Sequence, residues 1–258
     1  MQFHWNAAYY NQHSQFQYDH AEEALSSYAF KSHEHVLDVG CGDGKITYTI
    51  ASRVPEGTVV GIDSSESMIK YATNKFSNRP NLHFKVCDAE KIDYQNEFDL
   101  IVSFACLHWV RDQLAFLIGA RNALKANGLM ILDLYPKHPS IWGAIEDTVH
   151  HKKWAKYFVD YSNPHISYDL PLYETLTKKA GLKIISIKEQ IPIAQFTSRD
   201  EAEAFVHSWL PHTEQLSPPL KPSFISDVLE RFLENSPSCD DNNHIGIPFR
   251  RLDIILQK

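Results

Sequence analysis

Three glycines at alternate positions mark the most informative chemical segment of the chain, Val36-Leu-Asp-Val-Gly-Cys-Gly-Asp-Gly44. They follow a short apolar run typical of a buried strand and precede a stretch with helical periodicity. Glycine permits positive φ angles and lets backbone N–H groups approach a ligand closely. The segment lacks the GxGxxG spacing of dinucleotide sites and the GKS or GKT of a P-loop. It therefore favours a ligand without a pyrophosphate, although a tight turn is the structural alternative.

Three carboxylates stand at or near the ends of successive predicted strands. Asp38, just before the glycines, suits a cationic amino group better than a phosphate. Asp63 ends the strand predicted at 58–63, and a carboxylate there can accept hydrogen bonds from both ribose hydroxyls. Asp88 follows the strand predicted at 82–86 and can accept from an adenine amine, with Cys87 or Ala89 against the ring. A helix cap and a surface turn are the alternatives for Asp63 and Asp88. Together the carboxylates describe an adenosine that carries an amino acid, as in S-adenosylmethionine.

Two ring side chains follow the strand predicted at 98–104, in Phe104-Ala-Cys-Leu-His-Trp109. Trp109 offers an N–H donor and an aromatic wall that suits a sulfonium cation. His108 offers a proton acceptor. The alternative for Trp109 is that its ring packs in the core, and the alternative for His108 is a purely structural role.

The elements that must position these residues alternate regularly between 34 and 135. Five apolar runs predict strands, and the stretches between them have helical periodicity, the last of these helices ending at Asn127-Gly128. This alternation predicts a doubly wound α/β fold with parallel strands and right-handed crossovers. Ligands in such sheets bind beyond the carboxyl ends of the strands.

Beyond residue 136 the pattern is less regular. It predicts helices at 141–161 and 172–180, a capping-box helix that begins at Ser198, a break at SPPLKP, a helix at 224–233 and a polar loop at 235–244. Strands near 182–193 and 248–257 are expected to pair antiparallel, with a helical lid at about 195–240 between them. We therefore expect one domain over 1–258: an N-terminal helical cover (1–33), a cofactor-binding core (34–135) and a C-terminal half with the lid (136–258).

Composition narrows the functional classes. The net charge of −7 disfavours a broad nucleic-acid surface. No apolar run approaches the length of a membrane span, and the polar N-terminal segment does not resemble a secretory signal, so a cytoplasmic protein is expected. The four cysteines, Cys41, Cys87, Cys106 and Cys239, show no paired spacing, and no metal site is predicted.

Residues 34–135 resemble the class I, S-adenosylmethionine-dependent methyltransferases. The segments that carry this resemblance are VLDVGCGDG, VVGIDSSESM, VCDAE and IVSFACLHWV. Four further segments are similar to the small-molecule carboxyl methyltransferases typified by the juvenile-hormone-acid and trans-aconitate enzymes. They are WNAAYY…SQFQ near the N-terminus, LHWVRDQ, SWLP and FRRLDIILQ. The resemblance implies a Rossmann-like, mostly parallel, seven-stranded sheet with an antiparallel last strand and a helical lid insertion.

The resemblance also implies the site residues. Gln17 and Trp109 match the pair that grips the substrate carboxylate, although Gln15 satisfies the same loose spacing from Tyr10. The residues expected to contact S-adenosylmethionine are Tyr10, Asp38, Gly40, Cys41, Gly42, Gly44, Asp63, Ser64, Met68, Asp88, Ala89 and Ser103.

The expected reaction is transfer of a methyl group to a carboxylate oxygen of a small molecule. A carboxylate is ionised at neutral pH and needs no general base. Alternatively, the acceptor is a hydroxyl, amine or carbon with His108 as base, or the chain binds the cofactor without catalysis. The aromatic residues of 141–161, together with Phe205 and Trp209, favour an apolar acid, although core packing explains them equally well. A monomer or weak homodimer is expected, with no nucleic-acid partner.

Overall fold

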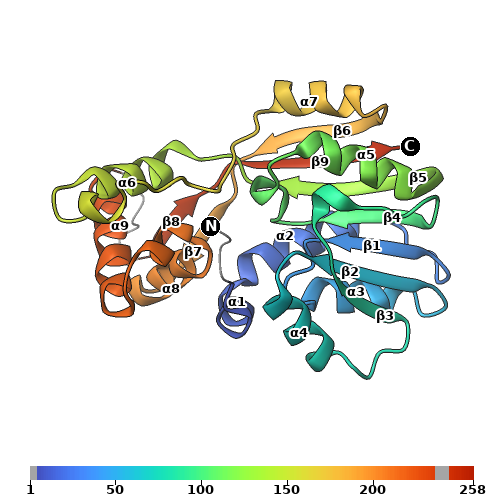
Figure 1. Ribbon diagram of the computed structural model, residues 1–258, viewed down its shortest axis with the longest axis horizontal. Coiled ribbons are helices and arrows are strands. Elements are labelled where there is room, and N and C mark those ends of the chain that lie inside the picture. Colours follow the sequence, from blue (N-terminus) through green and yellow to red (C-terminus); the bar gives the residue numbers. More distant parts are fainter. Residues whose placement is uncertain (1–4, 236–243) are drawn as a thin grey trace. The chain divides into compact units, whose positions relative to one another are not determined.

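A computed structural model describes residues 5–235 and 244–258, which form two compact units (Figure 1). The core unit comprises Trp5–Tyr135, Ile166–Gln190 and Arg251–Lys258. The helical unit comprises the described residues of Pro136–His165 and Ile191–Arg250. Cys239 and most of the loop expected at 235–244 lie outside the described residues.

The core unit is built on a seven-stranded sheet in the order β3-β2-β1-β4-β5-β9-β6, which confirms the predicted sheet. Strands β1 to β5 are parallel to one another. The strands are β1 (His35–Val39), β2 (Thr58–Asp63), β3 (Leu82–Val86), β4 (Phe98–Ser103), β5 (Leu124–Leu134), β6 (Lys183–Gln190) and β9 (Arg251–Gln257).

Strand β9 pairs antiparallel with β5 on one side and with β6 on the other. The predicted antiparallel pairing of the strands near 182–193 and 248–257 is therefore confirmed. Because β9 runs against β5, its first residue, Arg251, lies at the edge of the sheet where the parallel strands end.

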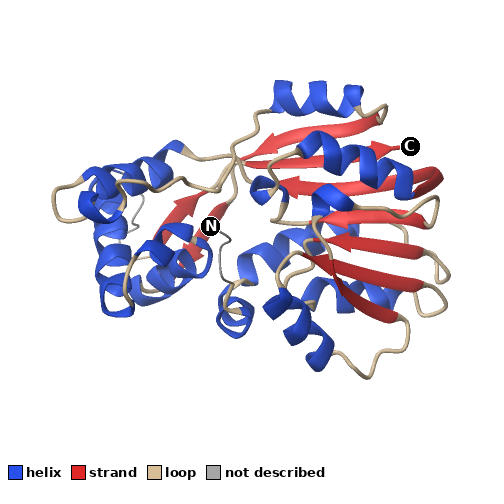
Figure 2. Cartoon of the chain, in the orientation of Figure 1, coloured by secondary structure: helices blue, strands red, loops and turns tan. Residues whose placement is uncertain are grey.

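Helices cover both faces of this sheet (Figure 2). Along β1, Val36 packs into one apolar layer, whereas Leu37 and Val39 pack into the other. Burial on both faces explains why the strands read as continuous apolar runs rather than as alternating ones. The helices of the core unit are α1 (Ala7–His13), α2 (Gln15–Ser26), α3 (Lys45–Arg53), α4 (Glu66–Lys75), α5 (Gln113–Ala123) and α7 (Leu170–Lys179), with single turns η1 (Ala89–Lys91) and η2 (Leu107–Trp109).

The boundary between α5 and β5 differs from the prediction. The helix ends at Ala123 rather than at Asn127-Gly128, and β5 already begins at Leu124, which pairs with Phe98. The register of β4 against β5 then shifts before Leu100 pairs with Leu129, and Asn127 has a φ of 63°. The Asn-Gly pair therefore lies in an irregular part of a strand, because Leu124 is buried against the sheet instead of continuing the helix.

The helical unit contains α6 (Pro139–His150), η3 (Ala155–Tyr157), α8 (Arg199–Trp209), η4 (Pro211–Gln215), η5 (Pro218–Leu220) and α9 (Lys221–Asn235). Its strands β7 (Ile193–Phe196) and β8 (Ile245–Pro248) pair antiparallel, although α8 and α9 lie between them in the chain, and the sequence did not predict this pairing. The capping box at the start of α8 is present: the Ser198 hydroxyl accepts from the Glu201 backbone N–H at 3.2 Å, and the Glu201 carboxylate accepts from the Thr197 N–H at 2.9 Å.

The helix predicted over 141–161 is shorter in the structure, because α6 ends at His150. Trp154 is almost fully buried: its ring centroid lies 5.2 Å from that of Phe224, and its indole N–H donates to Asp227 at 2.7 Å. Both partners lie on α9, so Trp154 is held by contacts with α9 rather than by a continuation of α6.

Among the described residues, no helix combines the length and apolar character that crossing a membrane requires.

Candidate functional site

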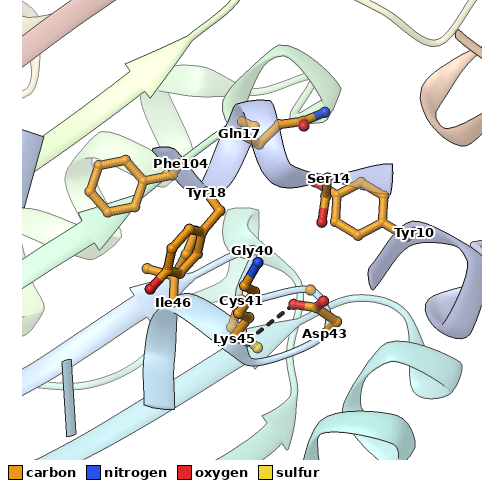
Figure 3. Close-up of a pocket in the computed structure, with 12 residues that line it drawn as sticks. Tyr10, Ser14, Gln17, Tyr18, Gly40, Cys41, Asp43, Lys45, Ile46 and Phe104 are labelled. Carbon is orange, nitrogen blue, oxygen red and sulfur yellow. Dashed lines mark hydrogen bonds between the residues drawn. The ribbon is translucent and has the colours of Figure 1, made fainter. Parts of the chain in front are cut away.

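A small cavity of about 30 Å³ lies in the core unit between the N-terminal helices and the glycine loop. Figure 3 shows Tyr10, Ser14 and Gln17 on one side of this cavity and the loop residues Gly40, Cys41 and Asp43 on the other. The loop follows β1 at the end of the sheet where a doubly wound fold binds its ligands. The full lining is Tyr10, Ser14, Gln17, Tyr18, Gly40, Cys41, Gly42, Asp43, Lys45, Ile46, Phe104 and Ala105.

The glycine loop has the backbone conformation that its sequence indicates. Gly40, Gly42 and Gly44 have φ angles of 74°, 52° and 79°, in the left-handed region. A Cβ on Gly40 would lie 2.1 Å from the Cys106 sulfur, whereas a Cβ on Gly42 would meet only a Tyr10 ring carbon at 4.0 Å. Gly40 therefore allows close packing beneath the loop, and the backbone at Gly42 is left open on its cavity side.

Asp63 fixes the loop and the start of α4. One carboxylate oxygen accepts from the Gly42 N–H at 3.0 Å, and the other accepts from the Ser65 N–H at 2.8 Å. Burial raises the pKa of Asp63, and these two backbone hydrogen bonds oppose that rise. Each oxygen keeps a second lone pair, so the carboxylate can still accept from a ligand.

Asp38 is buried beneath the same loop and accepts a hydrogen bond from the Thr47 hydroxyl at 2.7 Å. Burial raises the pKa of Asp38 to about 7, and the nearby carboxylates of Asp63 and Asp43 add to the rise. A cationic ligand would offset the effect of Asp63 and Asp43 on Asp38 and favour its charged form. S-adenosylmethionine carries an ammonium and a sulfonium group, so the charges around the loop fit the cofactor that the sequence predicts.

Gln17 and Gln15, which the sequence does not separate, lie in different environments. Gln17 lines the cavity, and its buried side-chain oxygen has no hydrogen-bond partner. Gln15 is exposed, where it donates to Asp19 at 2.6 Å and accepts from Lys45 at 3.0 Å. Of the two amides, only that of Gln17 lines the cavity.

A series of rings connects Tyr10 with Trp109. The Trp5 ring lies 5.5 Å from that of Tyr10 and 5.8 Å from that of Trp109, with edge-to-face geometry in both pairs. Trp109 is half-buried in η2 and does not itself line the cavity. Trp5 thus links the cavity residue Tyr10 to Trp109, a role that the sequence did not indicate.

His108 is buried against the end of β5. Its Nδ1 accepts from the Tyr135 backbone N–H at 3.3 Å, and its ring centroid lies 5.9 Å from that of Tyr135. A neutral imidazole that accepts at Nδ1 carries its proton on Nε2. In this arrangement neither ring nitrogen is available to take a proton from a substrate.

The remaining predicted cofactor residues lie around the same edge of the sheet. Met68 and Ala89 are buried, and Ser64 is exposed. Asp88 is half-buried, caps η1 through the Glu90 N–H and lies 3.6 Å from the Lys91 ammonium. The buried Ser103 hydroxyl donates to the Val39 carbonyl at 2.8 Å and so ties the end of β4 to β1.

Several residues of this site were not predicted from the sequence. Asn11 on α1 donates to the Asp43 carboxylate, which joins the helical cover to the glycine loop. Ala105 lines the cavity with a φ of 49°, and its N–H donates to the buried Asp133 at 2.5 Å. A left-handed alanine has no signature in the sequence, and strained backbone of this kind is frequent at functional sites.

Within the described residues, no group of three or more His, Cys, Asp or Glu side chains is arranged to hold a metal ion.

The close packing beneath the loop leads to a stability prediction. Gly40→Ala is expected to lower the free energy of unfolding by about 2–5 kcal/mol, from the positive φ and the clash with Cys106. The control is Gly143→Ala in α6, where an added Cβ meets nothing within 4 Å and a gain of about 0.5–1 kcal/mol is expected. Urea denaturation of both variants checks this, and equal stabilities for the two would contradict it.

Comparison with known protein families identifies residues 30–181 as a methyltransferase domain. The chain is 30% identical to the 235L protein of Invertebrate iridescent virus 6, which is named as a methyltransferase, over 88% of this chain and 85% of that one. It is 29% identical to the juvenile hormone acid O-methyltransferase of Bombyx mori, over 78% of this chain and 72% of the relative. A trans-aconitate 2-methyltransferase of Deinococcus radiodurans is 30% identical over 52% of this chain and 50% of its own length.

Solved structures share the fold at lower identity. Phosphoethanolamine N-methyltransferase 2 of Haemonchus contortus, in complex with S-adenosyl-L-methionine, superposes with a TM-score of 0.59 and 18% identity over 93% of this chain and 52% of that one. The [4+2]-cyclase SpnF gives a TM-score of 0.61 and 16% identity over 93% and 80%. Proteins with such different names share this fold, so the fold alone does not define the reaction.

The family match covers more than half of the chain, and it agrees with the parallel sheet, the glycine loop and the carboxylates around it. The chain belongs to the methyltransferase domain family and is a class I, S-adenosylmethionine-dependent methyltransferase.

Proposed function

We propose that this enzyme methylates a carboxylate oxygen of a small apolar acid to form a methyl ester. The observation that carries the proposal is the state of His108, whose ring is buried and whose Nδ1 is occupied by a backbone N–H. A hydroxyl or amine acceptor would need a group to take its proton, whereas a carboxylate is already ionised near neutral pH. The related Bombyx mori enzyme is named for an acid substrate, which supports the same reaction.

Each predicted cofactor residue has a proposed role. The loop from Gly40 to Gly44 and Asp38 would hold the amino-acid part of the cofactor, with Asp38 paired to its ammonium group. Asp63 would accept from the ribose hydroxyls and Asp88 from the adenine amine. Met68 and Ala89 would pack against the nucleoside. Ser64 would lie at its rim, and Ser103 would fix the end of β1 beneath it.

The cavity between the N-terminal helices and the glycine loop is lined by Tyr10 from α1 and Gln17 from α2. We propose that α1 and α2 cover the cofactor from this side, with Tyr10 closing over it. The hydrogen bond between Asn11 and Asp43 would hold this cover against the glycine loop.

When bound, S-adenosylmethionine supplies the activated methyl group. The enzyme's own contribution would be to orient the acceptor carboxylate and exclude water from it. The Gln17 amide and the Trp109 indole N–H would donate to that carboxylate without protonating it. These donors hold the oxygen in place while leaving its attacking lone pair free.

The direct test is incubation of the enzyme with methyl-labelled cofactor and a panel of aliphatic and aromatic acids. Labelled product that releases methanol in mild base is the expected result, because methyl esters hydrolyse under those conditions. A labelled product that is stable in base would overturn carboxylate methylation.

Replacing His108 by asparagine is expected to keep kcat for an acid within about tenfold of wild type. The asparagine carbonyl can still accept from the Tyr135 N–H, and no proton has to be moved in the reaction. A true general base contributes about 10²–10⁴-fold. Steady-state kcat at saturating cofactor measures this, and a loss of more than 100-fold would assign His108 the base role instead.

The affinity for S-adenosylmethionine is expected to fall as the pH is lowered through about 7. Protonated Asp38, whose pKa is raised to about 7 by burial, is neutral and cannot pair with the ammonium group. Below that pH the dissociation constant for S-adenosylmethionine should rise by at most about tenfold for each pH unit. Calorimetric titrations between pH 5 and pH 8 measure the slope. Asp38→Asn should bind more weakly and lose the slope, and an unchanged slope in this variant would contradict the pairing.

A further inference from the structure

A group of rings in the helical unit contains polar atoms that have no partner. Trp142 at the start of α6 lies 5.8 Å from Trp209 and 6.3 Å from His212, measured between ring centroids. Tyr161 lies 4.7 Å from His212. These four residues, which we call the ring cluster, come from α6, the end of α8, η4 and the segment after η3.

Three members of the ring cluster carry a buried polar atom without a hydrogen bond. They are the Trp209 indole nitrogen, His212 Nδ1 and the Tyr161 hydroxyl. His212 is 1% exposed and Trp209 is 8% exposed. Buried polar groups are rarely left unpaired, since each loses its water without gaining a partner. Three of them on adjoining rings are difficult to explain as core packing, for which phenylalanine and leucine would serve better.

The chemistry of these atoms defines the ligand that would satisfy them. The indole N–H only donates, and a tyrosine hydroxyl can donate. Burial lowers the pKa of His212 to about 3, so its ring is neutral near pH 7 and one of its nitrogens carries a proton. Uncharged donors among aromatic rings suit an uncharged oxygen, because burying a second carboxylate there would cost far more.

We propose that the ring cluster binds an apolar small molecule and hydrogen-bonds an uncharged oxygen within it, such as a ketone, ether or ester oxygen. Trp142 would provide an apolar ring face, and Trp209 and Tyr161 would donate to the oxygen. The proposal goes beyond the proposed function, because it concerns a site within the helical unit. It takes a ketone placed along an alkyl chain as the kind of group that this site would bind.

The test compares decanoic acid with its 5-, 7- and 9-oxo derivatives, which differ only in one ketone oxygen. Binding to the full chain is measured by calorimetry with S-adenosylhomocysteine present, and methyl ester formation is measured separately. At least one oxo acid is expected to bind about tenfold or more tightly than decanoic acid, a difference that one hydrogen bond can supply.

Two substitutions remove single donors while keeping a ring, Tyr161→Phe and Trp209→Phe. Both are expected to abolish the preference for the oxo acid, so that each variant binds it no more tightly than it binds decanoic acid. Tyr161→Phe should also raise the melting temperature of the protein without acid, since it removes a buried unpaired hydroxyl. The matched control is Tyr157→Phe, which removes a phenol hydroxyl from the same unit but outside the ring cluster and should keep the preference.

The outcomes separate this inference from the proposed function. Equal binding of all the acids, an unchanged preference in both variants, or tightest binding of decanedioic acid would overturn the inference, even if esters form. A preference for an oxo acid that both variants lose, with no ester from any acid, would support the binding site and overturn carboxylate methylation.

Discussion

Asp63→Ala is expected to raise the dissociation constant for S-adenosylmethionine by about 100-fold or more. Hydrogen bonds to a charged group are worth about 1.5–3 kcal/mol each, and the proposed contact with the ribose involves two of them. The substitution also releases the Gly42 and Ser65 N–H groups that the carboxylate now accepts from, which loosens the glycine loop. Calorimetry with the purified variant measures the affinity.

The matched control for this experiment is Asp88→Ala, at the end of the next strand. Asp88 is half-buried and already interacts with Lys91, so the loss there is expected to be tenfold or less. Thermal unfolding of both variants without cofactor establishes that they are folded. If the folded Asp63→Ala variant bound S-adenosylmethionine as tightly as the wild type, the proposed contact between Asp63 and the ribose would be excluded.

Gln17→Glu is expected to lower kcat/KM for an acid by about 10²–10³-fold without weakening cofactor binding. It places a carboxylate beside the proposed position of the acceptor carboxylate. Two like charges about 4 Å apart repel by roughly 4 kcal/mol at the effective dielectric near a protein surface. The added charge faces a cationic cofactor, so the affinity for S-adenosylmethionine should stay the same or increase.

Gln15→Glu provides the matched control, because that side chain is exposed and, unlike that of Gln17, does not line the cavity. Its kcat/KM is expected to remain within about threefold of wild type, in line with the small effect of exposed charges. Steady-state kinetics with both variants tests the assignment. A larger loss in Gln15→Glu than in Gln17→Glu would transfer the role to Gln15.

The features that the sequence predicted well depend on local signals. The strands at 58–63 and 82–86 have the bounds expected from their apolar runs, and the strand expected near 248–257 spans 251–257. The glycine loop and Asp63 are tied to each other by the Gly42 hydrogen bond. The glycine loop follows β1, and Asp63 ends the adjacent strand β2. The two strands are joined only by this loop and α3, so a short segment of the sequence determines the geometry.

Other features depend on contacts that no short segment encodes. Leu124 fits both a helix face and a strand, and only its pairing with Phe98 decides between them. The spacing from Tyr10 could not separate Gln15 from Gln17, because Ser14 interrupts the helix between Tyr10 and both glutamines. The unpaired atoms of the ring cluster also became visible only in the fold, since Trp142 and Trp209 are 67 residues apart in the chain.

The position of β9 has a consequence for how this protein is made. Residues 251–257 fill the gap between β5 and β6, so neither strand can pair with β9 until these residues have left the ribosome. Before that moment β5 and β6 each expose an unpaired backbone edge, and such edges are prone to aggregate. The nascent chain therefore passes through a vulnerable interval between the emergence of β6 and that of β9, in which chaperone binding would have its greatest effect on yield.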